Sequence, residues 1–103
     1  MENSIMDIDS LLKEIKEMVR PAKVILFHRK VENEGKTLSF KICIITQNKN
    51  KFDLEKEVYK NIDSDIPFDI IVYTSSEWER LKLNDDSFAS KILSRGFFID
   101  EPE

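Results

Sequence analysis

The segment TLSFKICIIT at residues 37–46 restricts the fold more than any other part of the chain. It begins with alternating apolar and polar residues and ends in a nearly continuous apolar run. Alternation is typical of a strand with one solvated face, and a continuous apolar run is typical of a strand inside a sheet. The sequence therefore predicts a strand that enters the middle of a sheet.

Three other segments have the short, apolar, β-branched composition of strands. They are KVILFH at 23–28, FDIIVYT at 68–74 and FFID at 97–100. We expect FDIIVYT to be largely buried and FFID to be a short final strand. A charged connection that contains Gly35 joins the strand at 23–28 to the one at 37–46.

Two longer segments repeat apolar residues at helical spacing. The first is expected to follow an N-cap at Asp7 or Asp9 and to end before Pro21. The second is expected at about 51–62, where four apolar residues lie on or near one helical face. These residues are Phe52, Leu54, Val58 and Ile62.

Two short helices are expected in the last third of the chain. In TSSEWERLKL, Ser76 and Glu79 have the spacing of a capping box at the start of a helix. The next helix passes through Phe88 and Ile92 and is predicted to end at Gly96, which would act as a left-handed C-cap.

The elements follow in the order helix, strand, strand, helix, strand, two short helices, strand. This order predicts an α+β fold with an α/β-like character: a small mixed sheet of about four strands with helices packed against it. A chain of 103 residues has the usual size of one domain, so we expect residues 1–103 to form a single domain.

The composition indicates a soluble globular protein, with 41% hydrophobic and 35% charged residues. No apolar run has the roughly 20 residues needed to cross a bilayer, and the N-terminal MENSIMDIDS is acidic where a signal peptide is basic. These features predict a cytoplasmic protein with no membrane contact. One cysteine and one histidine exclude a structural zinc site, and Cys43 within ICII is expected to be a buried thiol.

Charge is unevenly distributed along the chain, although the net charge is −4. Residues 16–60 contain eleven of the 16 Lys and Arg residues, and residues 35–52 contain no Asp or Glu. Two interpretations stay open at this point. The basic middle is either a solvated Lys-rich surface or a patch that faces an anion or a nucleic acid.

The last third, FDIIVYTSSEWERLKLNDDSFASKILSRGFFIDE, resembles the end of a minimal nucleotidyltransferase of the polymerase-beta-like superfamily. An Asp-containing strand leads to a T-x-x-E helix, then to a Ser-Phe helix that ends in Gly before a short strand. The first half agrees in layout, because KVILF follows an amphipathic helix and a proline. The resemblance implies a nucleotidyltransferase-like fold and the transfer of a nucleoside monophosphate from a nucleoside triphosphate. It also implies Mg²⁺ held by Asp-x-Asp on the second strand and by a third carboxylate on the neighbouring strand.

The family's triphosphate-binding Gly-Ser falls on His28 and Arg29 here, and the following residue is Lys30. The Ser that commonly precedes the first metal-binding Asp falls on Ser39. Histidine does not readily adopt the conformations of glycine, so a cradle of backbone N–H groups is not expected. The candidates for binding an anion through side chains are His28, Arg29, Lys30 and Ser39, and the alternative is an ordinary exposed basic turn.

Both principal metal positions of the family fall on hydrocarbon, at Phe40 and Ile42, and only the third carboxylate has a counterpart, Asp69. Without two of the three ligands, paired Mg²⁺ ions cannot be held in place. We therefore expect no catalytic residue, no metal and no cofactor. The alternating Phe40, Ile42 and Ile44 are expected either to belong to the core or to line an apolar former cleft that contacts a partner.

The leading hypothesis is a catalytically inactive domain, a pseudoenzyme, that acts by binding as a homodimer or with a small protein partner. The resemblance implies a HEPN-type protein of a toxin–antitoxin pair as one such partner. The first alternative is a working nucleotidyltransferase that binds Mg²⁺ and a nucleoside triphosphate at Asp69 and a relocated carboxylate, Glu32 or Glu34. The second alternative is a nucleotide or nucleic-acid binder without chemistry.

Overall fold

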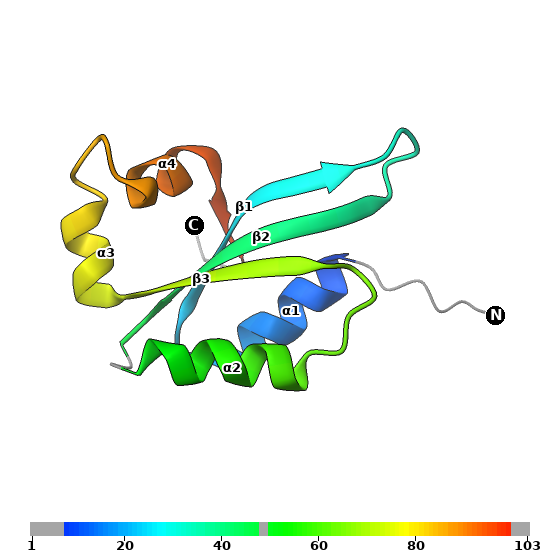
Figure 1. Cartoon of the computed structure of the whole chain (residues 1–103), viewed down its shortest axis with the longest axis horizontal. Helices are drawn as coiled ribbons and strands as arrows, with labels where there is room; N and C mark the ends of the chain where they lie inside the picture. The colour runs from blue at the N-terminus through cyan, green and yellow to red at the C-terminus, as the bar shows by residue number, and fades with distance from the viewer. Residues whose placement is uncertain (1–7, 48–49, 100–103) are drawn as a thin grey trace.

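The structure is a computed structural model that describes residues 8–47 and 50–99. Its elements are α1 (Ile8–Val19), β1 (Lys23–Val31), β2 (Thr37–Thr46), α2 (Lys51–Asn61), β3 (Phe68–Thr74), α3 (Ser75–Leu81), α4 (Phe88–Arg95) and β4 (Phe97–Phe98). The four strands form one mixed sheet in the order β3-β2-β1-β4 (Figure 1). The predicted α+β fold is confirmed.

β2 lies inside the sheet, as its apolar run predicts. It pairs antiparallel with β1 and parallel with β3. β1 also pairs antiparallel with β4, through Ile25 and Leu26. The predicted strand FFID is present as β4 but is shorter than predicted: it ends at Phe98, Ile99 follows it, and residue 100 lies outside the described residues.

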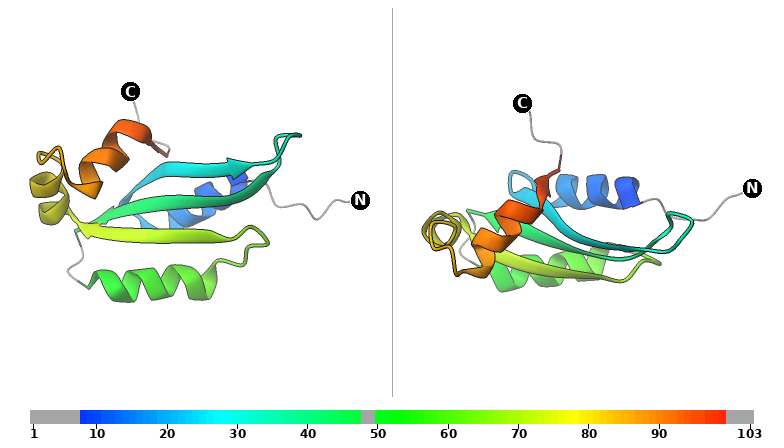
Figure 2. Two further views of the ribbon diagram at one scale, coloured as in Figure 1. Left: turned by 45° about the horizontal axis from the view of Figure 1, so that its top comes forward. Right: turned by 90° about the horizontal axis from the view of Figure 1, so that it is seen from above.

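Helices pack against both faces of the sheet. On one face, Phe40, Ile42 and Ile44 of β2 belong to a buried cluster with α1 and α2. On the other face, Cys43 and Ile45 belong to a second cluster with α3 and α4. In both views of Figure 2, α3 and α4 lie together at one end of the sheet, away from the tip of the β1–β2 hairpin. Within the described residues, no helix is long and apolar enough to cross a membrane.

The capping box of α3 lies two residues earlier than predicted. Glu77 N–H donates to Thr74 Oγ1 (3.2 Å), and Thr74 N–H donates to Glu77 Oε1 (2.9 Å). The predicted pair Ser76 and Glu79 is wrong because β3 runs to Thr74 and the helix begins at the next residue. The hydrogen bond from Thr74 and the ion pair with Lys51 lower the pKa of Glu77.

The longer helices also differ from prediction in detail. α1 begins at Ile8, so Asp9 lies inside its first turn and is not the N-cap. Asp7 lies outside the described residues. In α2, Val58 is buried but Phe52 is 69% exposed. Phe52 and Val58 are six positions apart on the helix, and each position rotates the side chain by about 100° around the axis. Their side chains therefore point to different sides, and Phe52 does not share the buried face of Val58.

Gly96 ends α4 in an extended conformation, with φ −96° and ψ 177°, and the predicted left-handed C-cap is wrong. Glycine is needed here for space. A Cβ atom at this position would lie 2.5 Å from Ile25 Cγ2 and 2.8 Å from Leu26 O. The glycine with positive φ is Gly35 (φ 85°), in the turn between β1 and β2.

β3 is less buried than predicted, because it forms one edge of the sheet. Only Val72 of this strand is buried, and the other residues are half-buried or exposed. The backbone N–H of Ile70 donates to the hydroxyl of Tyr59 in α2 (3.1 Å), so part of the edge is covered by that side chain. β1 is longer than predicted and continues from residue 28 to Val31.

Candidate anion-binding site

The family's two principal metal positions lie in the core. Phe40 is 1% exposed and Ile42 is 0% exposed, and the ring of Phe40 stacks on Phe68 with 5.2 Å between centroids. Both belong to the cluster packed under α1 and α2. The interpretation as core residues is confirmed. The alternative, an apolar cleft at Phe40, Ile42 and Ile44 that contacts a partner, is wrong because the chain's own helices already bury these side chains.

Asp69 does not converge with these positions. It pairs in register with Lys41, whereas Phe68 pairs with Phe40. Successive side chains of a strand point to opposite faces, so Asp69 lies on the face opposite Phe40 and Ile42, and it is exposed there. The part of the chain that the structure describes contains no group of three or more His, Cys, Asp and Glu side chains that could hold a metal ion.

The predicted anion-binding residues are divided between the two faces. His28 pairs with Lys41 and Lys30 pairs with Ser39, so these side chains share the face on which α3 and α4 pack. Arg29 pairs with Phe40 on the other face, where its Nε–H donates to Thr37 Oγ1 (2.7 Å). Arg29 therefore starts from the face opposite the other three candidates, although it lines a cavity of about 210 Å³ together with His28 and Arg95.

The carboxylates proposed for a relocated metal site, Glu32 and Glu34, lie in the turn between β1 and β2. The backbone N–H of Glu32 donates to Lys36 O (3.0 Å), and Gly35 N–H donates to Glu32 O (2.9 Å). These bonds belong to a tight hairpin turn. The turn places both residues beyond the end of β1, whereas Asp69 is the second residue of β3.

A cationic pocket lies between β1, β2 and α4. It is a cavity of about 130 Å³ lined by Phe27, His28, Lys41, Phe88, Lys91, Ile92 and Arg95. These residues include three cations and an imidazole, and none of them is an acid. A cavity of this volume has room for a phosphate-sized group. It is smaller than typical ligand pockets, which have volumes of roughly 300–1,000 Å³.

An irregularity in β1 forms one wall of the cationic pocket. The pairing shifts by one residue between Leu26 and His28, so Phe27 and His28 together oppose Lys41. Such a bulge turns two successive side chains toward one face. Phe27 therefore lies beside His28 and contacts Phe88 of α4 edge-on, with 5.7 Å between ring centroids.

Two exposed aromatic rings border this pocket. Phe88 is 50% exposed and Phe97 is 60% exposed. Phe97 lines an adjoining cavity of about 210 Å³ that shares Phe27, His28 and Arg95 with the cationic pocket. The site therefore combines positive charge with exposed flat apolar surface, which is the combination that single-stranded nucleic-acid sites use.

None of the three cations of this pocket was among the predicted anion-binding residues, and Lys41 alone lies in the basic stretch that the sequence analysis identified. Lys91 and Arg95 come from the acidic last part of the chain, outside the basic stretch 16–60. A signal was present, because residues four apart lie on one face of a helix and Phe88 falls on the same face three residues before Lys91. Only the packing of α4 on the sheet brings this face to His28.

Cys43 lies in the middle of β2 and is fully buried, as predicted. Burial raises the pKa of its thiol to about 12. Since the thiolate is the reactive form, Cys43 is structural in the folded protein.

Cys43 is expected to resist modification by dithionitrobenzoate in native buffer and to react completely once the protein is unfolded in guanidinium chloride. The measurement is the absorbance of the released thionitrobenzoate, with free cysteine as the control for reagent activity. Rapid labelling of the folded protein would contradict the burial of β2 under helices on both faces.

Comparisons of the chain with protein families, with curated proteins and with solved structures gave no match. The nucleotidyltransferase resemblance stays a prediction from the quoted residues. The same holds for the homodimer or HEPN-type partner that the resemblance implies.

Proposed function

We propose that this protein binds the phosphate backbone of a single-stranded nucleic acid, without catalysing nucleotide transfer. The observation that carries the proposal is the cationic pocket, whose lining has four basic side chains and no acid. Phosphate contacts of this kind supply most of the sequence-independent affinity for nucleic acids.

The exposed rings beside the pocket favour a single strand over a duplex. Bases of a single strand can stack on aromatic side chains, whereas bases in a duplex are already stacked on each other. Phe88 and Phe97 are each at least half exposed, one in α4 and one in β4. Each ring lines a cavity that Arg95 also lines, so a nucleic-acid strand whose phosphate occupies the cationic pocket would have both rings nearby for its neighbouring bases.

The absence of chemistry is proposed from the positions of the side chains. Phe40 and Ile42 offer no oxygen and lie in the core, while Asp69 lies on the opposite face. A single exposed carboxylate cannot hold the two metal ions that in-line transfer uses.

The test is the fluorescence anisotropy of a labelled single-stranded RNA or DNA oligonucleotide, titrated with protein at several salt concentrations. The double variant Lys91→Gln/Arg95→Gln is expected to bind at least about tenfold more weakly, because two charge-assisted contacts are lost. It is also expected to show a smaller salt slope, by about 0.7 for each phosphate contact removed.

The matched control is Lys56→Gln/Lys60→Gln. These two exposed lysines are also four residues apart on one helix, but α2 packs on the opposite face of the sheet. The control is expected to bind as the unmodified protein does. Equal weakening by both double variants, or affinity independent of salt, would contradict a site at the cationic pocket.

The working-enzyme hypothesis is tested separately. The protein is incubated with Mg²⁺ or Mn²⁺, a labelled nucleoside triphosphate and candidate nucleic-acid acceptors. No labelled product is expected. Transfer that Asp69→Asn abolishes would overturn the proposal of a non-catalytic binder.

A further inference from the structure

Four basic residues line one small volume in the cationic pocket. His28 comes from β1, Lys41 from β2, and Lys91 and Arg95 from α4. The cavity of about 130 Å³ has room for a single phosphate group, so all four residues border the same group. A groove that follows a nucleic-acid backbone would instead distribute its cations along the strand.

The cations of this pocket keep their positive charge without an acidic partner. Across residues 8–47 and 50–99, no ion pair within 4.0 Å involves Lys41, Lys91 or Arg95. Asp69 of β3 pairs in register with Lys41 but does not line the cavity. The pocket therefore has an excess of positive charge within a phosphate-sized space.

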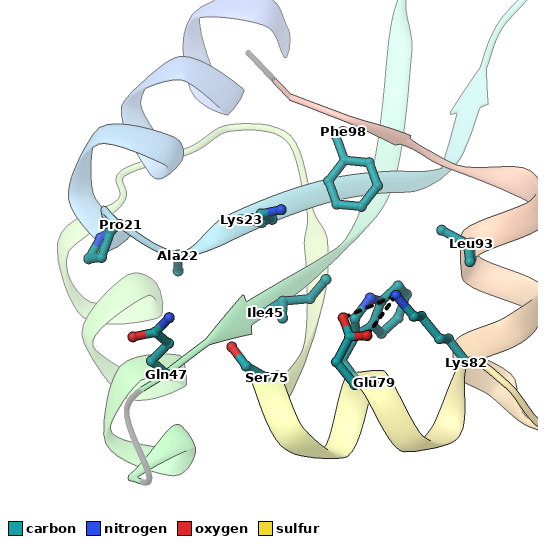
Figure 3. Close-up of a pocket in the computed structure, with 11 residues that line it drawn as sticks. Pro21, Ala22, Lys23, Ile45, Gln47, Ser75, Glu79, Lys82, Leu93 and Phe98 are labelled. Atoms are coloured by element: carbon teal, nitrogen blue, oxygen red, sulfur yellow. Dashed lines mark hydrogen bonds and ion pairs between the residues drawn. The ribbon is translucent and has the colours of Figure 1, made fainter. Parts of the chain in front are cut away.

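The larger cavity of the molecule has a different charge balance. It has a volume of about 410 Å³ and lies on the side of α4 that carries Leu93. Figure 3 shows Glu79 and Lys82 together at its wall, where 3.0 Å separates the Lys82 Nζ from the carboxylate oxygen of Glu79. Lys82 is thus a lysine outside the cationic pocket whose charge already has an anionic partner, which makes it a suitable control.

The excess charge of the cationic pocket fits the end of a nucleic-acid chain better than its interior. An internal phosphate is a diester with one negative charge. A terminal phosphate is a monoester, which carries a charge of about −1.5 to −2 at pH 7 and presents three acceptor oxygens. Three cations and an imidazole around one phosphate-sized volume match the monoester more closely, both in charge and in the number of acceptors.

The adjoining cavity provides a place for the nucleoside that carries this phosphate. It has a volume of about 210 Å³ and shares Phe27, His28 and Arg95 with the cationic pocket. Arg29 and Phe97 also line it. Phe97 is 60% exposed, so its ring is open to stacking by a base.

We propose that the cationic pocket binds the terminal phosphate monoester of a single-stranded nucleic acid, and that the terminal base stacks on Phe97. This inference rests on the proposed function, because it identifies which phosphate of the strand occupies the site. A 5′-phosphate and a 3′-phosphate offer the same chemistry, so the experiment compares both ends.

The experiment uses oligonucleotides of one sequence and about eight nucleotides, a length within the site sizes of single-strand-binding domains. Each carries a fluorescent label on a central base and ends in a 5′-phosphate, a 3′-phosphate or hydroxyl groups only. Fluorescence anisotropy is expected to show at least about tenfold tighter binding of one phosphorylated strand than of the hydroxyl-ended strand, because the added charge strengthens charge-assisted contacts. The free nucleoside monophosphate is expected to compete weakly, since it lacks the rest of the strand.

Three variants assign the effect to its residues, with circular dichroism as the check of folding. Lys91→Gln/Arg95→Gln is expected to bring the affinity ratio between phosphorylated and hydroxyl-ended strands close to one. Phe97→Ala is expected to weaken both strands by about fivefold or more through lost stacking and to leave their ratio unchanged. Lys82→Gln is the control, and it is expected to keep both affinities.

Equal affinity for all three kinds of end, or a ratio that Lys91→Gln/Arg95→Gln leaves unchanged, would refute the terminal site while the proposed function stands. Competition by the nucleoside monophosphate as strong as by the whole strand would also refute it, because the strand would then contribute nothing. Binding of a phosphorylated strand without any binding of the hydroxyl-ended strand would support the terminal site and contradict contacts with the internal backbone. If no strand binds, both proposals are wrong.

Discussion

Ile42→Asp is expected to unfold the protein rather than to restore a metal ligand. The side chain of Ile42 is 0% exposed in the cluster under α1 and α2. The substitution removes buried hydrocarbon and places a carboxylate where no water reaches it. Together these effects are expected to lower the free energy of unfolding by more than about 5 kcal/mol, which is most of the stability of an ordinary small domain.

The measurement is urea unfolding followed by far-ultraviolet circular dichroism. Ser39→Asp is the control, because it puts the same carboxylate on β2 outside the core, at a half-buried position that pairs with Lys30. We expect the control to change the free energy of unfolding by less than about 1 kcal/mol. A folded Ile42→Asp variant with a near-normal transition would show that this face of β2 can open, and it would return the family's metal site to consideration.

Gly96→Ala is expected to lower the free energy of unfolding by about 3 kcal/mol through steric overlap. The added Cβ would lie 2.5 Å from Ile25 Cγ2, 2.8 Å from Leu26 O and 3.0 Å from Ile92 O. Two of these atoms are backbone oxygens, so a change of rotamer cannot relieve the contact. Relief would require α4 and β4 to move away from β1.

Gly35→Ala is the matched substitution at the other glycine. No atom lies within 4 Å of a Cβ built there, but φ is 85°. The cost is therefore only that of the left-handed backbone, about 1–2 kcal/mol. Both costs are measured by the same urea transition. A loss for Gly96→Ala no larger than that for Gly35→Ala would contradict the close approach of Gly96 to β1.

Local patterns in the sequence were sufficient for most of the secondary structure. The spacing of apolar residues predicted α1 and α2, and the apolar run at 37–46 predicted the interior place of β2. The local patterns predicted burial wrongly where the surroundings of a side chain are formed by segments distant in the sequence. Phe52 fits the apolar helical pattern but is exposed, and β3 has an apolar sequence but lies at an edge.

The candidate site was predicted less completely. Of the four predicted anion-binding residues, only His28 lines the cationic pocket. Lys30 and Ser39 share its face of the sheet without lining the pocket, and Arg29 turns to the other face and bonds to Thr37. Lys91 and Arg95, which complete the cationic pocket, are more than sixty positions from His28 along the chain. Sequence spacing cannot join such segments, because their distance depends on how α4 crosses the sheet.

By itself, the sequence determined the order of helices and strands, the burial of Cys43 and the lack of carboxylates at residues 35–52, since each depends on residues within a few positions. The tertiary structure decided which face each side chain occupies. The register of β2 against β3 put Asp69 beside Lys41, on the other face of the sheet from Phe40, and the bulge in β1 put Phe27 beside His28. In a sheet, a shift of one residue reverses the face of every following side chain, so the cationic pocket could be recognised only after the strands were paired.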